Sequence, residues 1–494
     1  MAPRRPGSVA ALLLLGGCTV GPNYRPPAVA VPAVYGGASP GSTPNADVSQ
    51  WWRAFGDPAL NALIERAQSG NLDVRQAAGR VEEARAQQRV VRARGGPSLN
   101  AGAQAGYTRL SKNALPAGLA NLGGGGPSAG GSPIGLPGEN FATFQAGFDA
   151  SWEIDLFGGQ RRANEAAAAR TDAAVWSQRD AEVTLAAEVA RTYEHFRALQ
   201  RRIALADQSL AAKREALSFI RVRTTHGLVN TVDERRQQQD IQQAAAQRED
   251  LLGQADADIH ALGTLLGLAP TSLGVELSGS ASAPPLIEVP AGLPSDLLRR
   301  RPDIRAAERG LAAATADVGV ATADLYPKLS LTGALQLVSR SLATLLESDS
   351  LFANAAGRLS LPLIGGGKRE TVALRRTQAN EALIAYEAAI IGALRDVEDA
   401  LTRLQANRRK VADLRASVAA AQDAADTARV RQRNGLAPMT EVLQANETWL
   451  AGRDALAQAE AAAVQDEVAL YKALGGGWDE RRVNEEEPAR GRSR

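Results

Sequence analysis

The stretch FQAGFDASWEIDLFGG, residues 144–159, decides the fold of this chain. From Phe144 to Leu156, apolar side chains alternate with polar or small ones, which predicts a strand with one apolar and one polar face. Gly158 and Gly159 end that pattern, and the next 67 residues, 160–226, contain neither glycine nor proline. The sequence therefore predicts a two-faced strand that leads directly into a very long helix.

The long segment carries a regular apolar row. Apolar residues recur at every seventh position, namely Val189, Phe196, Ile203, Leu210 and Leu217. A strict seven-residue row is typical of a coiled-coil seam, so we expect this helix to pack lengthwise against other helices. At about 1.5 Å per residue it would extend for roughly 100 Å, some three times the thickness of a bilayer's hydrocarbon core.

The same pattern occurs twice along the chain. Pro97 and Leu99 recur 230 positions later, whereas the glycine at 227 and the pair Leu266–Gly267 recur 208 positions later. The 22-residue difference falls between the first two predicted strands, where residues 112–140 form a glycine-rich loop. An internal duplication follows from this register, and each half reads helix, strand, loop, strand, long helix, turn, helix.

Four strands are expected, near residues 99–107, 144–156, 329–337 and 353–363. Their lengths suit a tilted crossing of a bilayer, in which open strand edges cannot face lipid. Closed outer-membrane barrels begin at eight strands, so one chain is insufficient; three copies give twelve strands and leave room for a lumen. The alternative, a half-buried sheet in a soluble domain, is less favoured because little apolar sequence remains to cover it.

The beginning of the chain has the features of a processing segment. Arg4 and Arg5 precede a short apolar run, and Leu-Gly-Gly-Cys at 15–18 resembles a bacterial lipobox. We expect lipidation of Cys18, the only cysteine, over the alternative of an ordinary signal peptide. Thr19 is not the aspartate that retains such lipoproteins at the inner membrane, so outer-membrane lipid is the expected anchor.

These patterns divide the chain into six segments. They are a lipoprotein signal peptide (1–17), a lipidated tether (18–50), a first structural repeat (51–270), a linker (271–293), a second repeat (294–478) and a disordered tail (479–494).

Composition argues against several function classes. The 56 basic and 54 acidic residues are well mixed and give a net charge of +2, so no one-signed patch for nucleic acid is present. His195, His226 and His260 lie far apart without the spacing of a metal site. No nucleophile with a paired base and no phosphate-binding loop is recognisable. We expect no enzyme activity, no nucleic-acid partner, no metal and no cofactor other than the lipid on Cys18.

Several motifs together resemble one known family. They are the lipobox, the Trp-Trp-x-x-Phe-Gly-Asp-Pro opening at 51–58, Ser-Trp-Glu-Ile-Asp-Leu-Phe-Gly at 151–158, Leu-Pro-Ser-Asp-Leu-Leu-Arg-Arg-Arg-Pro-Asp-Ile-Arg at 293–305 and Ala-Asp-Leu-Tyr-Pro-Lys-Leu-Ser-Leu-Thr-Gly at 323–333. This set resembles the TolC-like outer-membrane efflux family, and most closely its OprM/NodT-type lipoprotein branch, over about residues 15–478.

The resemblance implies a mainly α-helical homotrimer with a membrane β portion. A 12-stranded barrel in the outer membrane would be continued by a long α-helical barrel in the periplasm. Such a trimer is the exit duct of a tripartite efflux pump, whose partners are a periplasmic adaptor and an inner-membrane transporter, commonly of the resistance-nodulation-division type.

The two helical turns are the expected functional ends. The turn residues Gly227, Leu228, Gly435 and Leu436 are where the resemblance places the adaptor. In the family, acidic residues of the second hairpin ring the periplasmic entrance, and Glu441 matches one of them.

The residues around this entrance, which we expect to form a periplasmic gate, depart from the family pattern at two positions. Gln444 stands where a second aspartate is common, and Gln432 replaces an aromatic residue. Asp233 is equivalent to Glu441 in the first repeat, although an acidic residue favoured by the helix dipole explains it equally well.

Two alternatives to an efflux duct stay open at this point. One is a type I-like protein-secretion duct of the same fold, and the other is a lipid-anchored periplasmic coiled-coil adaptor or spacer. The two full repeats with lipid-length strands favour a duct over a spacer. The exported substrate cannot be read from the sequence.

Overall fold

A computed structural model describes residues 19–36, 48–109, 140–228, 230–273, 285, 287, 289, 292, 294–363 and 366–478. The chain divides into two compact units. The sheet unit comprises the described residues of Met1–Arg25, Ala84–Arg170 and Leu311–Glu381. The helical unit comprises those of Pro26–Glu83, Thr171–Gly310 and Ala382–Arg494.

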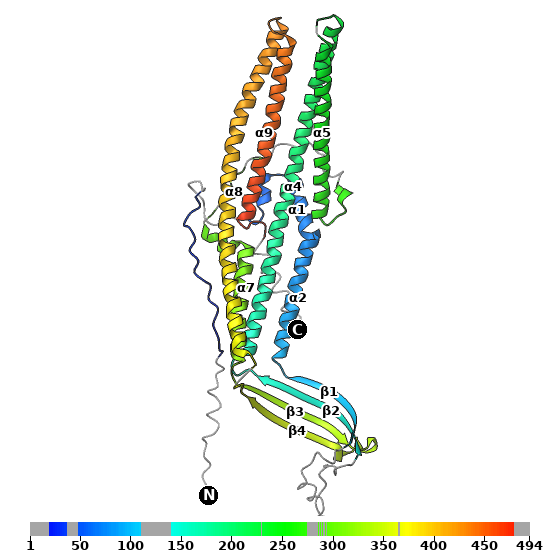
Figure 1. The fold of residues 1–494 in the computed structure, drawn as a ribbon, viewed down its shortest axis with the longest axis vertical. Coiled ribbons are helices and arrows are strands. Elements are labelled where there is room, and N and C mark those ends of the chain that lie inside the picture. Colours follow the sequence, from blue (N-terminus) through cyan, green and yellow to red (C-terminus); the bar gives the residue numbers. More distant parts are fainter. Residues whose placement is uncertain are drawn as a thin grey trace, which may run out of the picture. The chain divides into compact units, whose positions relative to one another are not determined.

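The sheet unit contains four antiparallel strands in sequence order (Figure 1). They are β1 (Ser98–Arg109), β2 (Asn140–Ile154), β3 (Lys328–Ser339) and β4 (Leu351–Ser360). The register aligns Asn100 with Asp149, Asp149 with Ala334, and Ala334 with Asn354. Every strand pairs with its neighbour in the chain, which leaves the outer edges of β1 and β4 without a partner strand within the described sheet.

The two faces of the sheet follow the predicted alternation. Asn100 and Asp149 share the polar face, where the Asn100 Nδ2 donates to the Asp149 Oδ2 over 3.1 Å. On the other face Leu99, Tyr107 and Leu359 are 70%, 74% and 66% exposed. An apolar face left open on a folded chain requires a further apolar surrounding, either lipid or protein.

Long helices follow each pair of strands (Figure 1). After β2 come α4 (Gly159–Thr225) and α5 (Thr231–Leu265); after β4 come α8 (Lys368–Arg433) and α9 (Met439–Ala473). The seven-residue row works as a seam, because Val189, Phe196 and Leu210 are at most 4% exposed. Among the described residues, no helix combines the length and the apolar composition needed to span a membrane.

Shorter helices precede each sheet half. They are α1 (Pro58–Gly70), α2 (Leu72–Arg94), α6 (Leu297–Arg300) and α7 (Pro302–Ala323). The repeat pattern predicts one helix before the first strand, but the structure has two there, separated at Asn71. The Asn71 side chain accepts hydrogen bonds from Asp73 N (2.8 Å) and Val74 N (3.0 Å), so it caps a new helix.

The core of the helical unit includes the Trp-Trp motif. Trp51, Trp52 and Phe55, in a 3₁₀ turn at Trp51–Phe55, are at most 4% exposed. Trp51 stacks on Tyr471 with ring centroids 5.0 Å apart, which joins the start of the first repeat to the end of the second. Stacked aromatic residues of this kind contribute beyond the area they bury.

The duplication is visible in the element bounds. Both ends of β1 and β3 differ by 230 positions, and both ends of α5 and α9 differ by 208. The boundaries of the six predicted segments stay predictions. The signal peptide with Cys18, the greater part of the glycine-rich loop 112–140, most of the linker 271–293 and the tail 479–494 lie outside the described residues.

Candidate functional site at the hairpin turns

Both long hairpins end in the same backbone turn. Gly227 and Gly435 have φ angles of 68° and 69°, a left-handed conformation that favours glycine. The Leu228 N–H donates to Arg223 O (2.9 Å), and the Leu436 N–H donates to Arg431 O (2.8 Å). In each turn the glycine N–H also donates to the carbonyl oxygen three residues earlier. Both turns are therefore Schellman motifs, in which two hydrogen bonds fix the end of the helix.

The leucine after each turn glycine is largely exposed. In Schellman motifs the residue at this position often packs back on the last helical turn. Here Leu228 and Leu436 are 67% and 70% exposed. Each hairpin therefore presents an apolar side chain to solvent from a rigid turn, which suits contact with another protein.

Glu441 lies in the first turn of α9 and is not an isolated carboxylate. The Arg431 Nη1, at the end of α8, approaches its Oε1 to 2.9 Å, and the Arg431 Nη2 donates to Leu436 O over 3.4 Å. The two side chains are 41% and 51% exposed. This partner was not foreseen, because the sequence alone gives no reason to choose Arg431 among the arginines of the hairpin end.

The other predicted gate residues are arranged differently. Asp233 is in the first turn of α5, where Arg236 Nη1 lies 4.0 Å from its Oδ1. Gln444 is exposed, one helical turn after Glu441. Gln432 accepts the Gly435 N–H through its backbone oxygen. Asp233 and Glu441 each pair within their own hairpin, and the structure records no contact that joins them.

Charged pairs that sequence reasoning missed tie the two hairpins together further along. Lys213 on α4 contacts Glu447 on α9 at 2.8 Å, and Arg202 contacts Asp454 at 2.8 Å. These four residues lie on helix surfaces beside the apolar seam. Only the pairing of α4 with α9 in space brings them together, so no local pattern could have identified them.

A metal centre has no candidate among the described residues. Within them, no group of three or more histidine, cysteine, aspartate or glutamate side chains could hold a metal ion. His195, one of the three histidines, lies with its Nδ1 at 2.6 Å from Asp258 Oδ2 on the neighbouring helix α5. That contact links two seam helices.

A family model described as "Outer membrane efflux protein" matches residues 63–268 and 293–476. The chain belongs to the outer membrane efflux protein family. It is 32% identical over 476 residues to the solvent efflux pump outer membrane protein SrpC of Pseudomonas putida, covering 95% of this chain and 97% of SrpC. It is also 32% identical to the outer membrane protein OprJ of Pseudomonas aeruginosa, covering 97% and 98% of the two chains.

Solved structures share the fold. The outer-membrane channel OprN matches with a TM-score of 0.82 at 33% identity, covering 93% of this chain and all of the OprN chain. The predicted fold class is confirmed: this is the fold of the trimeric efflux channels, with four strands and two long helical hairpins per chain.

Membership of the family establishes the general role. The efflux protein is the outer-membrane exit duct of an efflux pump, and its family is one of channels rather than of enzymes. It acts in the outer membrane. The uncovered apolar face of β1–β4 agrees with that location, and the family assignment favours a duct over a lipid-anchored coiled-coil spacer.

Proposed function

We propose that three copies of the efflux protein close one channel that exports small molecules together with a periplasmic adaptor and an inner-membrane transporter of the resistance-nodulation-division type. The observation that carries the proposal is the pair of Schellman turns with exposed leucines, repeated 208 residues apart. Three chains would present six such ends, alternating between first and second repeats. The exported substrate would be chosen by the transporter, and no catalytic activity is proposed for the duct.

The proposal includes a lipid on Cys18 as the only covalent addition and no other cofactor. The lipobox at 15–18 supports it. A thioether-linked diacylglycerol together with a barrel would hold the protein in the outer membrane through two independent attachments.

The periplasmic gate is proposed at Glu441, with Gln444 and Asp233 nearby in their own hairpins. Arg431 balances Glu441 within each chain, so an entrance lined by three copies would carry alternating charges instead of a purely acidic ring. Exposed pairs of this kind are worth about 0–1 kcal/mol, so they tune ion passage more than they hold the hairpin closed.

Neutralising the two partners should change ion selectivity in opposite directions. We expect Glu441→Gln to lower the cation-over-anion permeability ratio and Arg431→Gln to raise it. Each shift should be roughly two- to fivefold, as expected for interactions of about 0.5–1 kcal/mol between a permeating ion and an exposed charge. Reversal potentials of the purified protein in planar bilayers under a salt gradient measure both.

Glu249→Gln is the matched control. Glu249 on α5 is also exposed and paired with an arginine, with Arg248 Nη1 at 2.9 Å, but it lies far along the helix from the turn. A shift in Glu249→Gln equal to that in Glu441→Gln would argue that net charge alone matters. Unchanged selectivity in Glu441→Gln would move the constriction elsewhere while leaving the duct intact.

The turn leucines should matter for partner binding and not for stability. Combined replacement Leu228→Ser and Leu436→Ser is expected to reduce export by at least about tenfold, because two apolar contacts per chain of roughly 1 kcal/mol or more each would be lost. The melting temperature should stay within about 2 °C, since both side chains are more than 60% exposed. Substrate accumulation in cells and thermal unfolding measure the two effects.

Leu268→Ser is the control for that experiment. Leu268 follows Gly267 in another Schellman turn, with its N–H bonded to Gly263 O at 2.8 Å, but it lies at the opposite end of α5. Normal export in the double variant would contradict docking at the turns. A similar loss in Leu268→Ser would show that the effect is not specific to them.

A further inference from the structure

The segment that follows Cys18 is bound by one buried arginine in the sheet unit. The Arg162 Nε donates to Val20 O (3.2 Å), and its Nη2 donates to Gly21 O (3.4 Å) and Asn23 Oδ1 (2.6 Å). The Arg162 side chain is 4% exposed, and its Nη1 pairs with Glu165 at 2.8 Å. In return the Val20 N–H donates to Phe157 O over 3.1 Å. A guanidinium with this many oxygen partners is well suited to hold a peptide segment.

Three glycines let the segment approach closely. A Cβ on Gly21 would lie 2.5 Å from the Gly319 Cα, and a Cβ on Gly319 would lie 2.8 Å from the Arg162 Cδ. A Cβ on Gly158 would lie 2.8 Å from the Thr19 Cα. Larger residues at any of these positions would displace the segment or the arginine.

The second repeat provides an internal comparison. The position equivalent to Arg162 is Glu370, and the position equivalent to Gly319 is Arg89, by the offsets of 208 and 230 residues. The turn glycine itself is kept, because Gly158 corresponds to Gly366, which also has a positive φ. The duplicated scaffold therefore differs at the two residues that shape the contact. The difference is expected if Arg162, of the first repeat, and Gly319, of the second, serve the N-terminal segment, which contacts these two positions and not their equivalents Glu370 and Arg89 in the described contacts.

The bound segment lies where the strands meet the helices. Phe157, three residues after the end of β2, stacks on Tyr326, two residues before the start of β3, with ring centroids 4.8 Å apart. Aromatic residues at the ends of membrane strands typically mark the membrane–water interface. Val20 is bonded to Phe157 itself, so the segment runs beside this aromatic pair.

We propose that Arg162, Gly158 and Gly319 form a docking site for residues 19–24 of the mature chain, and that this site holds the acylated Cys18 against the periplasmic rim of the barrel. The inference rests on the proposed lipidation. Its consequence is that the acyl chains and the barrel enter the membrane at a fixed spacing. Tyr24 extends the contact by packing against Ala169, Ala312 and Ala313 of α4 and α7.

Hydrogen exchange of the full-length protein in liposomes tests the docking. In the unaltered protein the Val20 amide should exchange slowly, and Arg162→Ala should accelerate it by roughly tenfold or more, given the usual strength of charge-assisted hydrogen bonds. Arg369→Ala, one position from the equivalent Glu370 in the second repeat and exposed, should leave the exchange unchanged. Arg162→Lys should restore only part of the protection, because an ammonium group cannot hold three oxygens in one plane.

A second variant guards against a folding defect in Arg162→Ala. Gly21→Val leaves Arg162 in place and disturbs only the contact with Gly319, and it should expose the same amide. Rapid Val20 exchange in the unaltered protein, or equal exchange in Arg162→Ala, would overturn the docking site. The mass of the N-terminal peptide reports acylation separately: a protected Val20 with no acyl group would refute the anchoring role and the lipid proposal together, while the duct would stand.

Discussion

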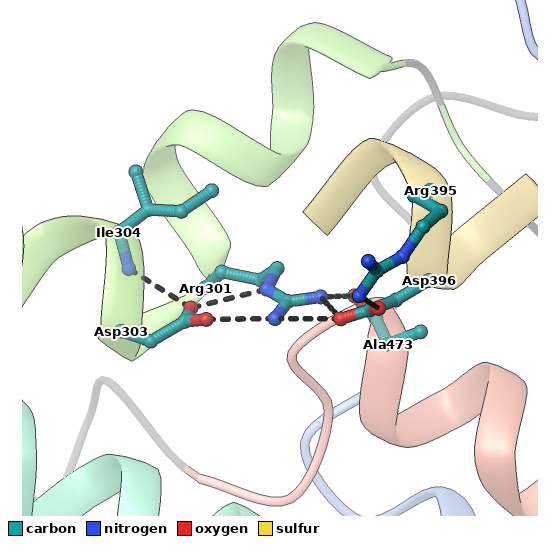
Figure 2. A network of polar contacts seen from close by, with 6 residues as sticks. All are labelled: Arg301, Asp303, Ile304, Arg395, Asp396 and Ala473. Atoms are coloured by element: carbon teal, nitrogen blue, oxygen red, sulfur yellow. Dashed lines mark hydrogen bonds and ion pairs between the residues drawn. The ribbon is translucent and has the colours of Figure 1, made fainter. Parts of the chain in front are cut away.

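Replacing Arg301 with methionine should lower the free energy of unfolding by about 3 kcal/mol per chain, because a buried cation would be removed from two carboxylates and a helix end. Figure 2 shows the Arg301 guanidinium between Asp303 and Asp396. Its Nη2 donates to Asp303 Oδ2 (2.7 Å), and its Nε donates to Asp303 Oδ1 (3.0 Å). Both terminal nitrogens also reach Asp396 Oδ2, at 3.4 Å each.

The position of Arg301 explains why one side chain has such a large expected effect. Its Nη1 donates to Ala473 O over 3.0 Å, at the C-terminus of α9, where a cation is favoured by the helix dipole. Asp303 lies in the first turn of α7 and also accepts the Ile304 N–H (2.9 Å), whereas Asp396 is on α8. One guanidinium therefore joins three helices of the helical unit. Its side chain is only 13% exposed, so water cannot readily replace these bonds.

Thermal and denaturant unfolding at one fixed protein concentration measure the effect. Arg299→Met is the matched control, since Arg299 is 76% exposed and pairs only with Asp296, at 3.3 Å, among the recorded contacts. It should change stability by no more than about 0.5 kcal/mol. Arg301→Lys should recover part of the loss, because lysine keeps the charge without the planar fork. Equal stabilities of the two methionine variants would contradict a structural role for the Arg301 network.

Periodic features of the sequence determined most of the architecture. Alternation over two residues places strands that the structure then shows at 140–154 and 328–339, and the seven-residue row becomes the buried seam of α4. The turns at Gly227 and Gly435 were also predictable, because a glycine after a long helix favours the left-handed backbone conformation that ends it, and both glycines have a positive φ. Such features depend on residues that are close together in the sequence, so they can be recognised without knowledge of the fold.

Contacts between distant segments were not predictable in the same way. Asn71 interrupts a helical region because its side chain also donates to Leu265 O (2.8 Å), 194 residues away. Lys213 beside Glu447 and the Arg162 docking site likewise depend on which segments become neighbours. The sequence predicts an entrance at the hairpin turns, which stays a prediction, but it does not predict that Arg431 pairs with Glu441. The charge of each partner decides the expected sign of its substitution.

A buried carboxyl group on α4 should make the stability of the protein depend on pH. Glu194 is 5% exposed, and burial raises its pKa to about 7. Burial is the largest single influence on that pKa; the charges of Arg201 and Arg197 lower it, whereas those of Asp57 and Glu467 raise it further. Because the native state then holds a proton that the unfolded chain releases near its ordinary glutamate value, this group favours folding at low pH. Its contribution is complete below about pH 4.5, diminishes as the pH rises to about 7, and is absent above.

Glu194→Gln should remove that dependence. A shift from 4.5 to about 7 corresponds to at most about 3 kcal/mol per chain, so we expect glutamine to stabilise the protein by about 1–3 kcal/mol at pH 8 and by little at pH 4.5. Denaturant midpoints across this pH range, compared between variant and unaltered protein, measure the difference.

Glu188→Gln on the same helix is the control, because the Glu188 side chain is 36% exposed and paired with Arg191. If the free energies of unfolding of Glu194→Gln and of the unaltered protein differed by the same amount at every pH, Glu194 would not titrate in this pH range. A variant less stable at pH 8 would show instead that the charged form, held by Arg201, is the one the fold requires.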